Sequence, residues 1–247
     1  MDVKLLNGFS VSQDGAEFEL GGRKPRTLLA VLAAHSPGFV TVDRCIEAVW
    51  GEDASSGAKR SLQTYVSTLR SVIDPERVGK IEGSDDGYRL VLGDGDRLDL
   101  GDFRDLASSG KYSEALGLWG EPLGDLAYDE WAQPLVREWT GEWLAVLERW
   151  ADGLLEAGAP AQVVSELERI TAAHPHHEGL TARLMTALYQ TGRQADALDR
   201  YRSLTVRLGE DLGVEPSPEL QDLEERILLH DPSLQRRQPT PTNVEPV

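Results

Sequence analysis

The sequence predicts a mainly α-helical protein in which β-strands are confined to the N-terminal 100 residues. Short strand-like runs occur only before residue 21 and between residues 80 and 93, while apolar residues elsewhere recur with helical spacing. A segment that begins with glycine is repeated after 34 residues, at Gly158 and Gly192. Such a period is typical of stacked helical hairpins. We therefore expect an α+β part followed by an all-α part.

Composition fits a soluble protein of one or two domains. The 247 residues are 40% hydrophobic and 27% charged. Because no run of about 18 apolar residues and no signal-peptide pattern is present, we expect no membrane partner and a cytoplasmic, nucleoid-associated location. The single cysteine, Cys45, excludes an internal disulfide and a cysteine-based metal site, and its helical spacing from Val42 and Val49 indicates a core position.

Charge is distributed unevenly along the chain, whose formal net charge is −17. Residues 1–100 contain 12 basic and 16 acidic side chains, whereas residues 101–247 contain 13 and 26. Two windows of the first part, residues 20–42 and 54–73, contain no Asp or Glu. Local basic surfaces on an acidic background favour a polyanion-binding module joined to a part that does not bind polyanions.

The first elements can be assigned in order. Asp14-Gly15 separates two strand-like runs and predicts a hairpin. A helix is predicted over residues 23–35, with Pro25 at its first position, and it ends before Pro37-Gly38. A second helix follows Thr41, a suitable N-cap, and ends at Gly51.

A third helix is predicted over residues 57–74, and two strands around a polar turn follow it. Its apolar stripe is Leu62, Val66, Leu69 and Ile73, and Asp74-Pro75 ends it. The opposite side lacks carboxylates and carries Lys59, Arg60, Gln63, Thr64, Ser67 and Arg70.

Strands, three helices and a hairpin, in this order, are typical of a winged helix-turn-helix, whose third helix enters the major groove of DNA. Arginine, glutamine, threonine and serine contact base edges, whereas a carboxylate on that face would repel phosphates. The polar side of the third helix therefore favours DNA reading. A merely solvated helix face is the alternative.

From residue 101 onward the pattern is almost entirely helical. The glycine-led segment also occurs at Gly110, and the 34-residue separation of the later copies is the tetratricopeptide period. The first copy lies 48 residues before the second, which makes residues 120–135 an irregular insertion. We expect domains at residues 1–100 and 101–232, and a disordered, Pro-rich tail at residues 233–247.

Several motifs resemble one known family. "RKPRTLLAVLA", "YVSTLRSVI", "GYRL" and, most specifically, "LGVEPSPEL" after the last repeat are similar to those of the bacterial antibiotic-regulatory-protein (SARP) activators. The resemblance covers about residues 1–232. It implies an OmpR-type winged helix followed by a bacterial transcriptional activation domain built from tetratricopeptide-like helices.

The resemblance also implies function and partners. Family members bind direct repeats in double-stranded promoter DNA side by side as homodimers. They recruit RNA polymerase, including its sigma factor, commonly at secondary-metabolite gene clusters that make antibiotics. By position, the polar residues of the third helix would face the groove. Phosphate or minor-groove contacts would come from Arg23, Lys24, Arg26, Tyr88 and Arg89. Asp85 and Asp86 in the wing turn depart from this pattern and argue against deep minor-groove insertion.

Other sites receive little support from the sequence. The histidine cluster at residues 174–177 and the acidic turn at residues 94–102 lack the ligand spacing of zinc and calcium sites. The tryptophans from Trp131 to Trp150 have the spacing of core residues, with an aromatic ligand cage as the alternative. We expect no catalytic residues, metal or cofactor. The alternative function is that of a helical-repeat adaptor whose winged helix binds protein. The second domain could also serve only in dimerisation.

Overall fold

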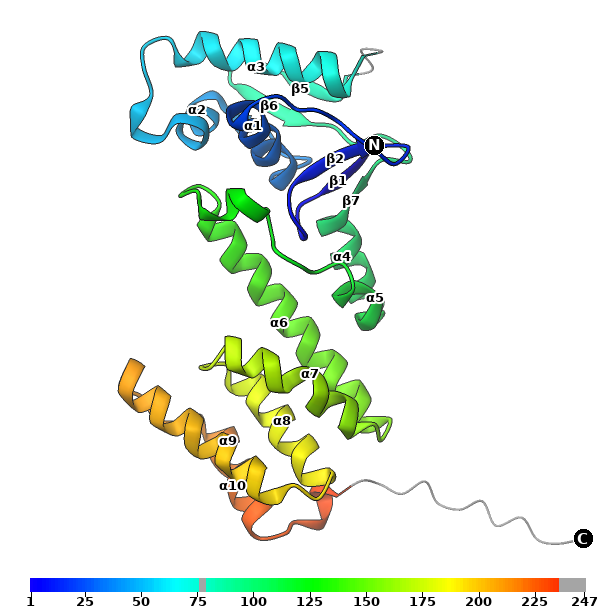
Figure 1. Cartoon of the computed structure of the whole chain (residues 1–247), viewed down its shortest axis with the longest axis vertical. Coiled ribbons are helices and arrows are strands. Elements are labelled where there is room, and N and C mark those ends of the chain that lie inside the picture. Colours follow the sequence, from blue (N-terminus) through cyan, green and yellow to red (C-terminus); the bar gives the residue numbers. More distant parts are fainter. Residues whose placement is uncertain (76–78, 236–247) are drawn as a thin grey trace, which may run out of the picture. The chain divides into compact units, whose positions relative to one another are not determined.

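The computed structural model describes residues 1–75 and 79–235 (Figure 1). The chain forms two compact units, one from Met1 to Trp143 and one that begins at Leu144. Helix α6 (Gln133–Glu156) contributes residues to both. The first unit therefore extends beyond residue 100, where we expected the winged-helix domain to end.

The first unit begins with the predicted winged helix-turn-helix. Its elements are β1 (Asp2–Lys4), β2 (Ser10–Gln13), β3 (Ala16–Glu17), α1 (Arg23–Ala34), β4 (Val40–Thr41), α2 (Val42–Trp50), a 3-10 turn (Gly51–Asp53), α3 (Ala58–Ile73), β5 (Ile81–Gly83), β6 (Gly87–Leu90) and β7 (Arg97–Leu98). The strands form two sheets, in the orders β3-β2-β1-β7 and β4-β6-β5. The β2–β3 turn has positive φ at both Asp14 (52°) and Gly15 (82°), as tight hairpins require.

Local signals set the ends of the three helices. Helix α1 begins at Arg23, as the predicted range has it, so that Pro25 is its third residue and not its first. Thr41 caps α2, because its side chain accepts a hydrogen bond from the Arg44 N–H at 3.2 Å. Gly51 ends α2 with a φ of 56°, which a residue with a side chain rarely adopts. Helix α3 packs on α1 and α2 through its apolar stripe.

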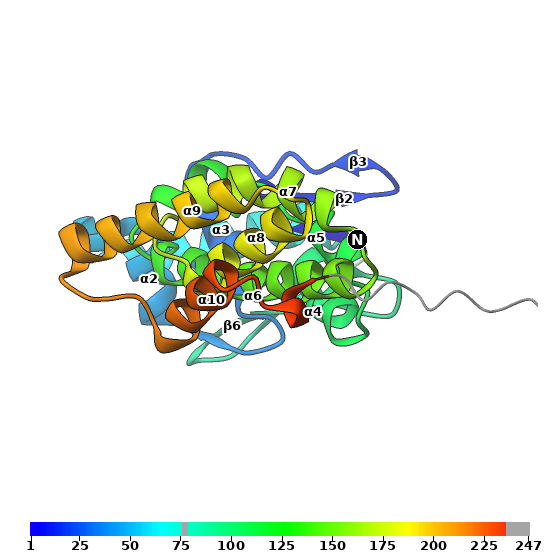
Figure 2. The ribbon, with the colours of Figure 1, turned by 90° about the horizontal axis from the view of Figure 1, so that it is seen from below.

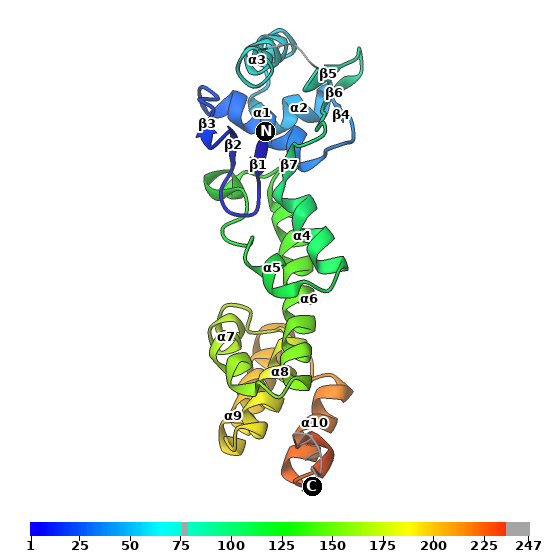
Figure 3. The same ribbon diagram turned by 90° about the vertical axis from the view of Figure 1, so that its right-hand side faces the viewer.

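Strands β5 and β6 and the turn between them form the wing, which lies beside α3 (Figure 3). Strand β6 pairs antiparallel with β4 and β5, with Val40 opposite Tyr88 and Ile81 opposite Leu90. Gly87 has no room for a side chain, because a Cβ there would overlap the carbonyl oxygen of Val40. The wing is thus fastened to the segment that leads into α2.

The predicted irregular insertion is confirmed as irregular, and it packs against the N-terminal strands. It follows α4 (Asp99–Ser108) and α5 (Tyr112–Leu116) and contains the 3-10 helix η2 (Gly124–Tyr128). The N–H of Gly120 donates to Leu6 O at 2.9 Å, that of Leu123 donates to Leu5 O at 2.7 Å, and that of Gly8 donates to Glu121 O at 2.8 Å. Leu5 and Leu6 are both fully buried. This segment therefore completes the core of the first unit.

The acidic turn at residues 94–102 holds the N-terminal strand. Asp99 accepts hydrogen bonds from the N–H groups of Leu5 and Leu6 at 2.8–2.9 Å, and burial raises its pKa. Burial would also raise the pKa of Asp96. Hydrogen bonds from Lys80 and the Met1 amino group outweigh that effect and lower the pKa to about 2. The predicted polar turn is thus a structural anchor.

The second unit contains the predicted helical hairpins. Its elements are the last part of α6, α7 (Pro160–Ala173), α8 (Glu178–Gln190), α9 (Gln194–Arg207), the π-helical turn η3 (Leu208–Leu212), α10 (Pro218–Leu228) and η4 (Pro232–Leu234). Helix α8 packs between α7 and α9 (Figure 2). Gly158 and Gly192 open the two hairpins with φ of 73° and 80°.

The end of the described chain lies close to the predicted start of the tail. Leu234 is buried, and its carbonyl oxygen accepts a hydrogen bond from the Gln190 side chain at 3.1 Å. The predicted tail began at residue 233, so its first two residues belong to the packed structure. Residues 236–247 lie outside the described residues.

Two remaining predictions concern Cys45 and membrane-spanning helices. Cys45 is fully buried, as predicted, and burial raises the pKa of its thiol to about 12. Within residues 1–75 and 79–235, no helix has the length and apolar character needed to cross a bilayer.

Candidate nucleic-acid interface

Helix α3 separates its buried and exposed sides cleanly. Leu62, Val66, Leu69 and Ile73 are at most 2% exposed. The opposite side, called here the α3 polar face, consists of exposed side chains that the sequence predicted: Lys59, Arg60, Gln63, Thr64 and Ser67. The burial of the apolar stripe therefore fixes which side chains are presented to a partner.

The cations of the α3 polar face form no ion pair in the described part of the chain. No carboxylate lies within 4.0 Å of the cationic groups of Lys59 or Arg60 there. Thr68 and Ser71 are also exposed on this side, and our sequence analysis missed them. Their membership of the acid-free window was a signal that could have included them.

Arg70, the sixth residue predicted on this face, is only half-exposed and holds the wing. Its Nε donates to the carbonyl oxygen of Ile81 at 3.0 Å. A Cβ at position 83 would lie 3.2 Å from the Arg70 guanidinium and 3.0 Å from the Tyr88 ring. Gly83 thus lets both side chains pack against β5. This contact gives Arg70 a structural role in addition to the base contact that we predicted.

The predicted wing residues also have partners within the wing. Tyr88 and Arg89 are half-buried. The Arg89 Nε donates to Glu82 at 2.7 Å, and its guanidinium lies 4.7 Å from the centre of the Phe39 ring. Asp85 and Asp86 are exposed in the turn. The Glu82 carboxylate therefore compensates the positive charge of Arg89. The tip of the wing carries the acidic side chains of Asp85 and Asp86.

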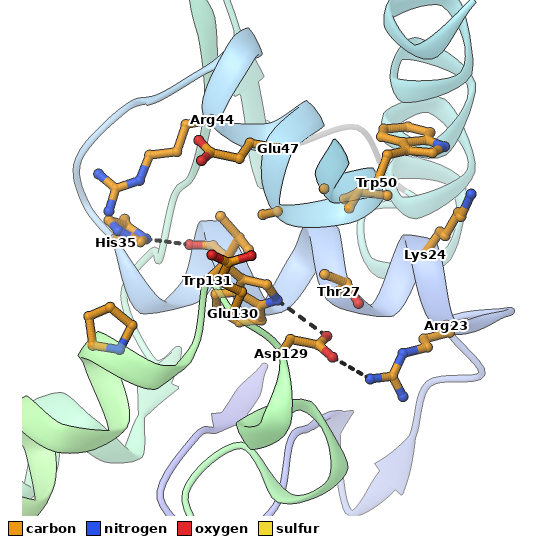
Figure 4. A pocket seen from close by; sticks show the side chains of 15 residues that line it. Arg23, Lys24, Thr27, His35, Arg44, Glu47, Trp50, Asp129, Glu130 and Trp131 are labelled. Carbon is orange, nitrogen blue, oxygen red and sulfur yellow. Dashed lines mark hydrogen bonds and ion pairs between the residues drawn. The ribbon is translucent and has the colours of Figure 1, made fainter. Parts of the chain in front are cut away.

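The predicted phosphate-binding residues at the start of α1 have different surroundings, and Figure 4 shows two of them, Arg23 and Lys24. Arg23 donates to Asp129 at 2.6 Å and to Asp125 at 3.4 Å. Arg26 donates to Asp125 at 2.7 Å and to the carbonyl oxygen of Phe9 at 3.2 Å. Asp129 also accepts a hydrogen bond from the indole of Trp131 at 3.3 Å. We call Arg23, Arg26, Asp125 and Asp129 the arginine–aspartate cluster.

Lys24 lies outside this cluster and contacts an aromatic stack. Its ammonium group lies 5.2 Å from the centre of the Trp50 ring. Trp50 stacks in turn on Tyr65 of α3, with ring centres 5.7 Å apart and planes 11° apart. The stack connects the start of α1 with α3. Sequence reasoning did not single out Trp50 or Tyr65, because neither their charge nor their spacing indicates a contact between helices.

A cavity of about 520 Å³ lies between α1, α2 and residues 129–134. Figure 4 shows Arg23, Lys24, Trp50 and Trp131 on its walls. Trp131 is therefore a wall residue, although the sequence assigned it to the core. Trp139 is buried, and Trp143 stacks on Trp119 with ring centres 5.2 Å apart, as core residues do.

Two protein families match the chain in series. The family described as "Transcriptional regulatory protein, C terminal" matches residues 16–90. The family described as "Bacterial transcriptional activator domain" matches residues 98–228, which is more than half of the chain. The first match covers α1, the α3 polar face and the wing, and the second covers the helical hairpins.

Individual proteins resemble the chain over most of its length. Regulatory protein AfsR of Streptomyces coelicolor is 39% identical over 90% of this chain, which spans 24% of AfsR. Regulatory protein DnrI of Streptomyces peucetius is 31% identical, and the match covers 97% of this chain and 96% of DnrI.

A solved structure shows the same fold. Mycobacterium tuberculosis EmbR, in complex with a low-affinity phosphopeptide, superposes with a TM-score of 0.84 at 32% identity. The match covers 94% of this chain and 65% of the EmbR chain. The chain thus spans less than two thirds of AfsR and of EmbR. With its OmpR-type winged helix and its bacterial transcriptional activator domain, the chain belongs to the SARP family of transcriptional activators.

Proposed function

We propose that this chain binds direct repeats in promoter DNA through the α3 polar face and recruits RNA polymerase to a secondary-metabolite gene cluster. The observation that carries the proposal is an exposed helix face with Lys59, Arg60 and Gln63 and no paired carboxylate in the described chain. Lysine and arginine contact phosphates and guanines, and glutamine contacts adenine. The family match supports action on DNA, and hence in the cytoplasm.

The net charge of −17 makes this local face necessary for binding. A chain that is acidic overall is repelled by duplex DNA at long range, so adhesion without sequence preference is weak. Binding then depends on the close fit of one helix in the major groove. Two copies on adjacent direct repeats, about one helical turn apart, would add their contacts.

The domain that follows the winged helix would contact RNA polymerase. Residues 101–247 contain 26 acidic and 13 basic side chains. Polymerase surfaces that hold promoter DNA, including those of the sigma factor, are basic, so an acidic domain beside the promoter is attracted to them. We propose domain limits of 1–100 and 101–232 for these two activities, although the first compact unit continues to Trp143.

One observation favours a different function. Arg23, Arg26 and Arg89 are paired with carboxylates in the protein, which lowers the number of unpaired cationic side chains on the winged helix. A helical-repeat adaptor that uses the winged helix to bind protein would require fewer unpaired cationic side chains than a DNA-binding protein. This alternative predicts no preference for any DNA sequence.

A gel-shift experiment distinguishes the two functions. Promoter fragments with direct repeats, and the same fragments with the repeats scrambled, are titrated with the protein in the presence and absence of RNA polymerase. We expect a shift only with intact repeats, and a slower-moving complex when polymerase is added. Equal binding to both fragments under both conditions would favour the adaptor.

A further inference from the structure

The arginine–aspartate cluster joins residues that lie far apart in the sequence. Arg23 and Arg26 belong to the first turn of α1, whereas Asp125 and Asp129 lie about 100 residues later, in η2 and directly after it. The first turn of α1 contains no acidic residue. Within the described residues, the carboxylates paired with the two arginines therefore come from the other end of the first unit.

The ion pairs in the cluster are partly exposed to solvent. The side chains of Arg23 and Asp125 are 55% and 50% exposed, and those of Arg26 and Asp129 are 29% and 24% exposed. Exposed pairs contribute little to stability and weaken further in salt. These carboxylates can therefore be exchanged for other anions at small cost.

The start of α1 is also connected to the DNA-reading helix. Lys24 lies against Trp50, and Trp50 lies against Tyr65 of α3, so only two ring contacts separate the first turn of α1 from α3. A duplex that binds the α3 polar face has a phosphate every few ångströms along each strand. Phosphates at the edge of that duplex would be placed close to the first turn of α1.

These observations lead to an interaction that depends on the proposed DNA-binding function. We propose that Asp125 and Asp129 are internal competitors of DNA phosphates for Arg23 and Arg26. When a duplex binds, phosphates replace the two carboxylates, and residues 124–131 are released from α1. Binding to unrelated DNA is thereby weakened, because the exchange must take place on every duplex.

The test compares two double variants of the full chain. D125N/D129N removes the competing charges, and E121Q/E130Q removes the same number of charges from the same segment without touching either arginine. Affinity for a fluorescein-labelled duplex of random sequence is measured by anisotropy between 50 and 200 mM salt, a range chosen on the basis of counterion release.

We expect D125N/D129N to bind random duplex about tenfold more tightly than E121Q/E130Q at 50 mM salt, because no carboxylate has to be displaced from the arginines. This advantage should shrink as salt rises, because salt already weakens the aspartate–arginine pairs of the control. Adding R23A/R26A to D125N/D129N should remove the advantage. The inference is overturned if the two double variants bind alike, or if the gain survives the loss of the arginines.

A second measurement follows DNA binding by the unmodified protein, and a variant serves only to assign one resonance. The Trp131 indole N–H donates to Asp129, so its NMR resonance reports on that carboxylate. A W131F variant identifies the resonance among those of the six tryptophans. We expect saturating random duplex to shift it, and an unchanged position would overturn the inference.

Failure of the two proposals can be distinguished. If intact and scrambled repeats bind equally while D125N/D129N still binds more tightly than its control, the proposed promoter recognition fails and the competition stands. If repeats are recognised but the two double variants bind alike, only the competition fails. If no variant binds any duplex, both proposals fail.

Discussion

The α3 polar face and the first turn of α1 have similar charge patterns in the sequence but different surroundings in the structure. Both lie in windows without acidic residues, and both carry basic side chains that we predicted to contact DNA. In the structure, Lys59 and Arg60 have no carboxylate within ion-pair distance in the described chain, whereas Arg23 and Arg26 are paired with aspartates. A stretch of sequence without acids is therefore not the same as a surface without acids.

The difference arises from what covers each helix. The N-terminal strands and the segment around η2 are held together by backbone hydrogen bonds between residues 5–8 and 120–123. That pairing brings Asp125 and Asp129 to α1. Helix α3 contacts other elements through its apolar stripe, Tyr65 and Arg70, so its outer side stays exposed.

Of the changes predicted here, shortening the chain should have the largest effect, and that effect is on thermal stability. A fragment of residues 1–100 lacks η2 and the backbone partners of Leu5 and Leu6, whereas a fragment of residues 1–143 keeps them. We expect the shorter fragment to melt at least about 10 °C lower in a circular dichroism experiment, because several hydrogen bonds and buried leucines are lost. Equal melting temperatures would show that residues 101–143 add no stability.

The two sides of α3 should respond differently to alanine. Leu62→Ala removes a fully buried side chain and should lower the free energy of unfolding by about 2–5 kcal/mol. Lys59→Ala, on the exposed side, should change it by no more than about 0.5 kcal/mol. Urea denaturation of both variants checks this. A large loss from Lys59→Ala would mean that the α3 polar face is part of the fold.

The α3 polar face and α1 should also differ in the kind of binding that they support. Arg60→Ala or Gln63→Ala should reduce discrimination between operator and random duplex by about 1–3 kcal/mol, because base contacts are lost. Arg23→Ala should leave discrimination unchanged. Competition binding with both duplexes provides the measurement. If all three variants lost affinity for both duplexes to the same extent, the assignment of reading residues would be wrong.

Arg70→Ala should have a modest effect on both stability and base preference, because Arg70 lies on the polar side of α3 and also holds the wing. Its hydrogen bond to Ile81 O predicts that Arg70→Ala lowers the free energy of unfolding by about 1 kcal/mol. Base preference should change less than it does for Arg60→Ala. Thermal melts and operator selection measure the two effects separately. A changed base preference with unchanged stability would restore Arg70 to the reading residues.

Local patterns in the sequence predicted much of this fold. The helices α1, α2 and α3 and the hairpin turns follow from apolar spacing, from the Thr41 cap and from Gly51, all of which act within a few residues. The 34-residue repeat likewise predicted the hairpins opened by Gly158 and Gly192. The exposed side of α3 was predictable because the apolar stripe fixes its orientation.

Contacts between residues far apart in the sequence could not be predicted in this way. Strand β1 pairs in parallel with β7, so that Asp2 lies opposite Arg97, and no periodicity in the sequence signals this contact. The packing of residues 120–123 on residues 5–8 is of the same kind. The carboxylates around Arg23 and Arg26 follow from that packing. Their presence could not be inferred from the neighbouring sequence.

The buried thiol of Cys45 makes the protein convenient for spectroscopy. Maleimides and related reagents attack the thiolate, and a fully buried thiol with a pKa of about 12 forms almost none at neutral pH. Since the chain has no other cysteine, a cysteine introduced at an exposed position such as Ser55 would be labelled selectively in the folded protein. Fluorescent or paramagnetic labels can then be attached near α3 without first removing the natural cysteine.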